Sequence, residues 1–134
     1  MKRKSSTLSL SRPNGNRVAI YVRVSTALQA EEGFSLDAQE KVCRQFAENR
    51  AWQAVEVFRE PGVSAKDDNR PAFQRMISAA KARQFDVILT HKLDRFSRSI
   101  LDVLTYLRDL HEWDVAYASA TENFDFSTPM GKMQ

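Results

Sequence analysis

Branched apolar residues recur at every second position over residues 18–24, which predicts a β-strand near the beginning of the chain. The alternation places Tyr21, Arg23 and Ser25 together on one face of that strand. A nearly continuous apolar run over residues 86–90 is typical of a strand buried on both faces of a parallel sheet. Two more strands are predicted at residues 54–58 and 114–118.

Helical spacing of apolar residues predicts three helices between these strands. Ser35 is a suitable N-cap for a helix that ends near Arg50. Pro71 fits the first position of a second helix, and a third is predicted over residues 99–111. The positions expected to face the sheet are Leu36, Cys43, Phe46, Ala47 and Arg50 in the first helix, Phe73, Met76, Ile77 and Ala80 in the second, and Leu101, Leu104 and Leu107 or Arg108 in the third.

Strands that alternate with helices predict an α/β fold with three layers. We expect a mostly parallel, Rossmann- or flavodoxin-like sheet of four to five strands flanked by helices. Residues 1–16 are expected to form a flexible basic tail, and residues 17–127 to form the domain. Residues 128–134 are expected to begin a further helix that is cut short, because Thr128-Pro129 resembles a helix start.

Composition narrows the class of protein but does not identify a ligand. Hydrophobic residues make up 43% of the chain and charged residues 28%, as in soluble globular proteins. The net charge of +3 is concentrated in the first 30 residues, which carry six basic residues and no acid, so the body of the domain is slightly acidic. No apolar run approaches the roughly 20 residues of a membrane span. The single cysteine, Cys43, fits a buried thiol in a reducing cytoplasm.

Local charge is more informative than the net charge. Lys92, Asp94, Arg95 and Arg98 follow the strand at residues 86–90. The carboxyl ends of parallel strands meet at one edge of a sheet, where ligands commonly bind. Arg23 and Ser25 at the end of the first strand, and Arg70 at the start of a helix, are predicted to reach that edge too. Such a set favours binding of a phosphate group, with Ser25 as a candidate nucleophile.

Simpler interpretations of these residues are also open. Arg23 could pair with an acid while Ser25 caps a turn, and Asp94 could pair with Arg98 four residues later if the segment is helical from Asp94. A small-molecule phosphatase or nucleotide-binding protein is disfavoured because the chain has no phosphate-binding glycine loop. No metal or other cofactor is expected, since neither histidine has a ligand at a metal-like spacing.

Taken in order, the motifs resemble the catalytic domain of the serine recombinases, the resolvase and invertase family. The resemblance covers about residues 17–134. The long spacing between Ser25 and Gln39 is similar to that of the large serine recombinases, which include phage integrases and mobile-element transposases. The matching motifs are Tyr21-x-Arg23-x-Ser25-Thr26, Ser35-Leu36-x-x-Gln39, Asn69-Arg70-Pro71, Lys92-Leu93-Asp94-Arg95-x-x-Arg98 and Met130-Gly131-Lys132-Met133.

The resemblance implies a site-specific recombinase in which Ser25 attacks a phosphodiester of double-stranded DNA and forms a 5′-phosphoserine bond. It implies that Asp94 orients the arginines or takes part in proton transfer, with Tyr21, Gln39 and Lys92 in support. It further implies a cytoplasmic, nucleoid-associated protein of bacterial or phage origin, whose full-length form builds a dimer and a synaptic tetramer. The residues implied to bind the scissile phosphate are Arg23, Arg70, Arg95 and Arg98.

Two consequences are expected for residues 1–134 on their own. We expect this fragment to be monomeric or weakly associated and not to recombine DNA by itself. The alternative function is a catalytically silent DNA-binding or regulatory module that keeps the same fold.

Overall fold

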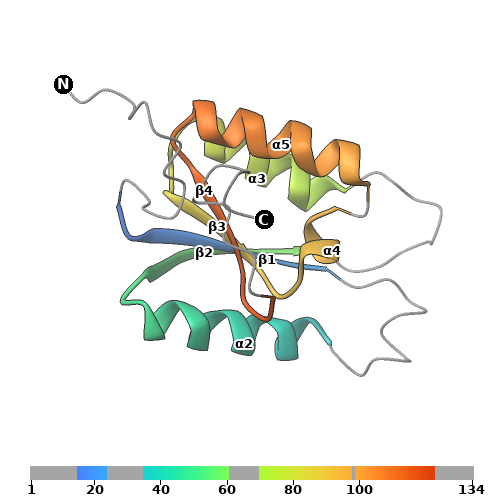
Figure 1. The fold of residues 1–134 in the computed structure, drawn as a ribbon. Coiled ribbons are helices and arrows are strands. Elements are labelled where there is room, and N and C mark those ends of the chain that lie inside the picture. Colours follow the sequence, from blue (N-terminus) through green and yellow to red (C-terminus); the bar gives the residue numbers. More distant parts are fainter. Residues whose placement is uncertain (1–14, 24–34, 61–69, 98, 123–134) are drawn as a thin grey trace, which may run out of the picture.

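The computed structural model describes residues 15–23, 35–60, 70–97 and 99–122, which form a parallel sheet flanked by helices (Figure 1). The sheet has the strand order β2-β1-β3-β4, and every neighbouring pair is parallel, as predicted. The strands are β1 (Arg17–Arg23), β2 (Gln53–Glu60), β3 (Val87–Thr90) and β4 (Ala116–Ser119). The helices are α2 (Leu36–Asn49), α3 (Pro71–Lys81), α4 (Leu93–Phe96) and α5 (Ile100–Glu112).

The helices lie in two layers, with α2 on one face of the sheet and α3 and α5 on the other (Figure 1). The alternation in β1 serves both layers: Ile20 and Val22 belong to the core beneath α2, whereas Ala19 and Tyr21 belong to the core beneath α3 and α5. The predicted three-layer α/β fold is therefore confirmed. None of the helices in the described ranges combines the length and apolarity needed to cross a bilayer.

Helix α2 begins as predicted, with the hydroxyl of Ser35 accepting a hydrogen bond from the backbone N–H of Ala38 at 3.1 Å. Cys43 is fully buried beneath this helix, and burial, followed by the charge of Glu40, raises the pKa of its thiol to about 12. The expectation that Arg50 faces the sheet is wrong. Its side chain is exposed, and its guanidinium lies 3.8 Å from the centre of the Phe46 ring, because burying an unpaired charge is costly whereas stacking on an aromatic face is favourable.

Helix α5 has the predicted extent but is rotated relative to the prediction. Leu101 is 72% exposed and Leu104 is 53% exposed, and Arg108 is exposed as well. The residues that are buried instead are Val103 and Leu110.

The rotation of α5 follows from its partners. The helix carries apolar residues on most of its circumference, so periodicity alone admits more than one inward face. The ring of Tyr106 packs 5.0 Å from that of Phe73 and 5.9 Å from that of Phe96. This aromatic contact turns Val103, Tyr106 and Leu110 toward the core and leaves Leu101 and Leu104 on the surface.

Each long helix is followed by a residue with a left-handed backbone. The φ angles of Ala51, Arg83 and Asp114 are 61°, 60° and 63°, and each residue directly follows the C-cap of α2, α3 or α5. Glycine is the usual residue at this position because it has no Cβ to clash. Here alanine, arginine and aspartate bear the strain, at the edge of the sheet where the next strand begins.

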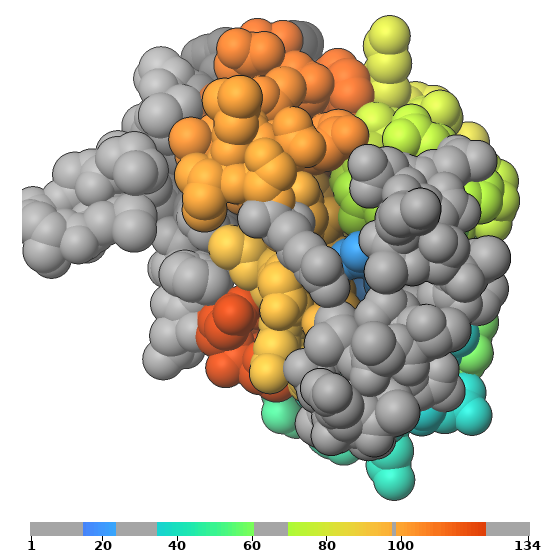
Figure 2. Space-filling view, turned by 90° about the vertical axis from the view of Figure 1, so that its right-hand side faces the viewer, coloured from blue at the N-terminus to red at the C-terminus, as the bar shows by residue number. Residues whose placement is uncertain are grey.

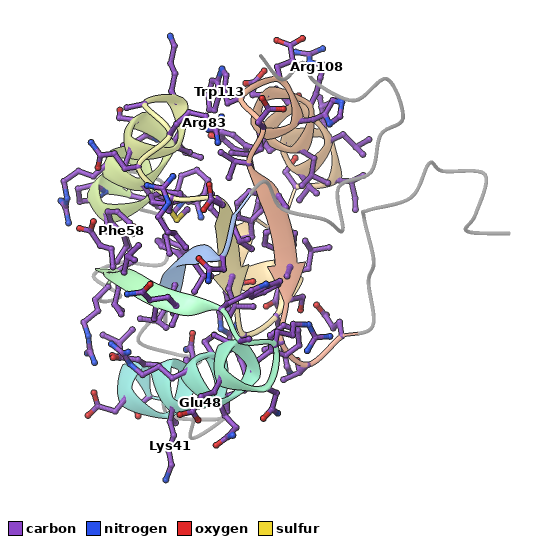
Figure 3. All side chains as sticks on the ribbon, turned by 90° about the vertical axis from the view of Figure 1, so that its left-hand side faces the viewer. Lys41, Glu48, Phe58, Arg83, Arg108 and Trp113 are labelled. Carbon is purple, nitrogen blue, oxygen red and sulfur yellow. The ribbon has the colours of Figure 1, made fainter. Side chains whose placement is uncertain are left out.

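An ion-pair cluster of Arg17, Arg83 and Asp86 holds the same amino-terminal edge of the sheet, and Arg83 is labelled in Figure 3. The buried carboxylate of Asp86 accepts hydrogen bonds from the backbone N–H and the guanidinium of Arg17, both at 3.0 Å, and lies 3.6 Å from the guanidinium of Arg83. Burial acts to raise the pKa of Asp86, but the hydrogen bonds from Arg17 and the charges of both arginines outweigh it. The net pKa is lowered from its usual value.

Asp86→Asn is expected to lower the free energy of unfolding at about pH 7 by about 1–3 kcal/mol, since it removes a buried charged acceptor. Because the pKa of Asp86 is lower in the folded state, its contribution is complete above the unfolded pKa of about 4 and is lost as the pH falls through the folded value. The difference between the two proteins should therefore narrow below about pH 4. Urea denaturation across this pH range tests the expectation, with the more exposed Asp109→Asn as the control. Equal stability of Asp86→Asn and the natural protein at neutral pH would contradict it.

Candidate active site

The predicted site residues that lie in the described ranges gather at the carboxyl-terminal edge of the sheet. Arg23 is the last residue of β1, Arg70 directly precedes α3, and Asp94 and Arg95 lie in α4, which follows β3 after two residues. Figure 2 faces this edge and shows α4, in gold, beside the visible part of β1, in blue. Ser25 and Arg98 fall outside the described residues.

Arg23 connects the end of β1 to α4. Its guanidinium donates a hydrogen bond to the carbonyl oxygen of Asp94 at 3.3 Å. Its backbone is held by Gln39, whose buried side-chain amide accepts from the Arg23 N–H at 3.2 Å and donates to the Arg23 carbonyl at 3.0 Å. Gln39 thus fixes the backbone of Arg23, which lies two residues before Ser25 in the sequence.

Arg70 also contacts the backbone of α4. Its guanidinium donates to the carbonyl oxygen of Phe96 at 2.7 Å and stacks with its central carbon 3.7 Å from the centre of the Phe73 ring. It is the N-cap residue of α3 and makes no side-chain capping bond. Arg23 and Arg70 therefore both converge on the four-residue helix α4, although they are far apart in the sequence.

Helix α4 presents the charged residues that the sequence grouped together. Arg95 has a side chain that is 2% exposed and contacts the carboxylate of Asp94 at 3.1 Å, whereas the side chain of Asp94 is 55% exposed. Lys92 is the N-cap of α4 and is half-buried. Asp94 thus lies at the surface of the site, and Arg95 lies at its floor.

A pair between Asp94 and Arg98 four residues later was expected only if the helix continued from Asp94 through Arg98. The helix does not continue that far. Helix α4 ends at Phe96, and Ser97 has extended backbone angles of −167° and 148°. Among the described residues, the carboxylate of Asp94 pairs with the adjacent Arg95.

Tyr21 lies beneath the site rather than at its surface. Its side chain is fully buried, and its hydroxyl donates to Glu60 at 2.8 Å. Burial is the largest cause that raises the pKa of this phenol well above its usual value, so the hydroxyl stays protonated. Tyr21 is placed to support the site from the core.

Two carboxylates at this edge were not identified from the sequence. Glu60 lies beyond the strand predicted at residues 54–58, but β2 extends through it and buries it, and its spacing of two from the buried Phe58 was the available signal. Glu122, beyond the end of β4, accepts from the backbone N–H of Leu93 at 2.6 Å and from the hydroxyl of Ser119 at 2.9 Å. Its role had no signal in the sequence, because it depends on contact across 29 residues.

The arrangement favours binding of an anion. Guanidinium groups present flat forks of donors that match phosphate oxygens and stay charged at any working pH. Within the described ranges, no group of three or more histidine, cysteine, aspartate or glutamate residues could hold a metal ion. The candidate chemistry of these described side chains is therefore binding and orientation of phosphate by arginine.

Comparison with known proteins gives consistent matches. A family model for the resolvase N-terminal domain matches residues 18–134. The solved structure of the N-terminal catalytic domain of TP901-1 integrase is 41% identical, with a TM-score of 0.76 over 87% of both chains. The DNA-invertase hin of Salmonella typhimurium is 29% identical over 84% of this chain and 52% of its own length. The Tn552 resolvase of Staphylococcus aureus is 31% identical over 84% of this chain and 51% of its own length. The chain thus spans about half the length of these two curated relatives.

Proposed function

Because the chain belongs to the resolvase family of serine recombinases, we propose that it is the catalytic domain of a site-specific DNA recombinase. The observation that carries the proposal is the convergence of Arg23, Arg70 and the Asp94–Arg95 pair at the edge where β1 leads toward Ser25. An arginine cluster of this kind suits a phosphodiester, and Ser25, two residues after Arg23 in the sequence, is the proposed nucleophile.

In the proposed reaction the hydroxyl of Ser25 loses its proton as its oxygen bonds to phosphorus. The bond from phosphorus to the 3′ oxygen breaks, and that oxygen takes up a proton and leaves as a free 3′-hydroxyl. The products are a 5′-phosphoserine and a 3′-hydroxyl, so the number of phosphoester bonds is unchanged. Attack of a 3′-hydroxyl on the phosphoserine then reseals a strand without any external source of energy.

The arginines have distinct proposed roles that follow from their positions. Arg23 and Arg70 are half-buried, each donates a hydrogen bond to a backbone carbonyl of α4, and together with Arg98 they bind the phosphate oxygens. Arg95 acts from the floor of the site, where it also holds Asp94, and Asp94 orients the arginines or moves a proton. Lys92, Gln39 and Tyr21 support this set from α4, α2 and the core.

Double-stranded DNA is the proposed substrate, and self-association to a dimer and then a synaptic tetramer is proposed for the full-length protein in the cytoplasm. Residues 17–127 form the proposed catalytic domain, between a basic tail at 1–16 and the start of a further helix at 128–134. Helix α5 supports self-association because Ile100, Leu101 and Leu104 are 70%, 72% and 53% exposed on its surface.

The deciding experiment mixes the full-length natural protein with sheared genomic DNA of its source organism. Protein is denatured and precipitated with detergent, and the DNA that coprecipitates covalently is sequenced. We expect recurrent fragments that end at one site, and Ser25→Ala should abolish them because no nucleophile remains. Covalent DNA that persists in Ser25→Ala would overturn the assignment of the nucleophile. Specific DNA binding by the natural protein without covalent capture would favour the silent DNA-binding module.

A further inference from the structure

The helices that do not carry the candidate arginines begin in the ordinary way. Helix α2 is capped by Ser35, and α5 by Ser99, whose hydroxyl accepts from the backbone N–H of Asp102 at 3.2 Å. Serine at this position satisfies one of the backbone N–H groups that a helix start leaves without a partner.

The two helices at the candidate site begin differently. The N-cap residues of α3 and α4 are Arg70 and Lys92, and neither makes a side-chain capping bond. A cation at the start of a helix is unfavourable, because the positive end of the helix dipole lies there. The start of α3 therefore lacks both the capping acceptor and the negative charge that favour a helix start, whereas α4 lacks the capping acceptor but has Asp94 in its first turn.

Glu60, at the end of β2, supplies the capping acceptor and the negative charge at the start of α3. One carboxylate oxygen accepts from the backbone N–H of Phe73 at 2.9 Å and from the hydroxyl of Tyr21 at 2.8 Å. The other oxygen accepts from the backbone N–H of Ala72 at 3.1 Å. Glu60 is 6% exposed, so its carboxylate, and not water, accepts the hydrogen bonds of these donors. Glu60 thus ties the start of α3 to β2 and, through Tyr21, to β1.

Glu122 makes the corresponding contact with α4. Its carboxylate accepts from the backbone N–H of Leu93, the first residue of the helix, and from the hydroxyl of Ser119 in β4. In both cases a carboxylate at a strand end caps a helix whose own N-cap residue is a cation.

We infer that Glu60 is a positioning residue for Arg70, and that Glu122 acts in the same way on α4. Capping from a distant strand end leaves the N-cap position of α3 available for an arginine directed at the phosphate. The guanidinium of Arg70 stacks on the ring of Phe73, and the backbone N–H of Phe73 donates to Glu60. The position of the first turn of α3 therefore sets the position of the Arg70 guanidinium. The inference rests on the proposed function, because it assumes that Arg70 binds the scissile phosphate.

The test is a double-mutant cycle on the full-length protein, with the rate of covalent bond formation on the duplex recovered by the capture experiment as the readout. Glu60→Gln keeps the size of the side chain but sets an amide N–H₂ against backbone N–H donors. We expect it to slow the reaction at least about 10-fold in the natural background and less than about 2-fold in the Arg70→Ala background. Losses of equal size in both backgrounds would overturn the inference, because Glu60 would then not act through Arg70.

Asp86→Asn provides the matched control, since it also neutralises a buried carboxylate that accepts from a backbone N–H, but at the opposite edge of the sheet. The rate of covalent bond formation by Asp86→Asn should lie within about 2-fold of the natural rate, at a temperature well below the melting points of both proteins. A loss as large as that of Glu60→Gln would show a general effect of stability and would also overturn the inference.

A second readout separates this inference from the proposed function. The same cycle is measured as equilibrium affinity in Ser25→Ala protein, where no covalent bond can form, for a genomic duplex selected by its noncovalent retention on that protein. If the natural protein forms no covalent bond, the proposed reaction fails, but coupling between Glu60 and Arg70 in affinity still supports the positioning role. If Glu60→Gln and Arg70→Ala act independently on both the affinity and the rate, the positioning role of Glu60 is rejected.

Discussion

The Arg70→Ala variant is expected to form the serine–DNA bond about 100- to 1000-fold more slowly than the natural protein, because it loses a preorganised donor to the charge that develops on phosphate. The guanidinium is already held in place by the Phe96 carbonyl and the Phe73 ring, so little reorganisation precedes the reaction. Single-turnover measurements with excess protein and the captured duplex give the rate.

Two further variants make this measurement specific. Arg70→Lys keeps the charge but loses the planar fork and its stacking, so its rate should lie between those of the natural protein and Arg70→Ala. Arg75→Ala removes an exposed arginine from the same helix and should react at the natural rate. The assignment of Arg70 to the phosphate fails if Arg70→Ala and Arg75→Ala react equally fast.

Phe73→Ala is expected to produce the largest loss of stability, about 3–5 kcal/mol, as is typical when a large buried aromatic side chain is removed. The ring is fully buried and packs edge-to-face against Tyr21, Phe96 and Tyr106 at centroid distances of 5.4, 5.5 and 5.0 Å. It therefore joins β1, α3, α4 and α5 in one cluster. Denaturant unfolding followed by circular dichroism gives the change in free energy.

Leu101→Ala is the matched control for Phe73→Ala. Leu101 is a large apolar residue but is 72% exposed, so its removal should change the free energy of unfolding by less than about 0.5 kcal/mol. If the two variants lose similar stability, the aromatic cluster is not the centre of this core.

The strands and their order of connection were predictable because they depend on local pattern. The run of apolar residues in β3 and the alternation in β1 each identify a strand without reference to the rest of the chain. The meeting of Arg23, Arg70 and α4 at one edge follows in turn from the geometry of a parallel sheet. For the same reason, the described part of the candidate site could be anticipated from sequence.

The features that escaped prediction depend on contacts between distant segments. The inward face of α5 is set by the contact of Tyr106 with Phe73 and Phe96, which periodicity within α5 does not contain. Glu60 and Glu122 have capping roles only because the fold brings strand ends to helix starts. The carboxyl ends of the helices could not be predicted from glycine either, because non-glycine residues occupy the left-handed positions.

Those left-handed residues, Ala51, Arg83 and Asp114, also bear on how the domain can evolve. They lie where each helix returns to the amino end of the next strand, whereas Arg23 and Arg70 lie at the carboxyl ends (Figure 1). Glycine at position 51 relieves the clash of the Cβ atom without loss of an ion pair, whereas glycine at position 83 or 114 would also remove the contact of Arg83 with Asp114 at 3.8 Å. A lineage can therefore gain stability at one end of the sheet and tolerate destabilising changes among the candidate site residues at the other.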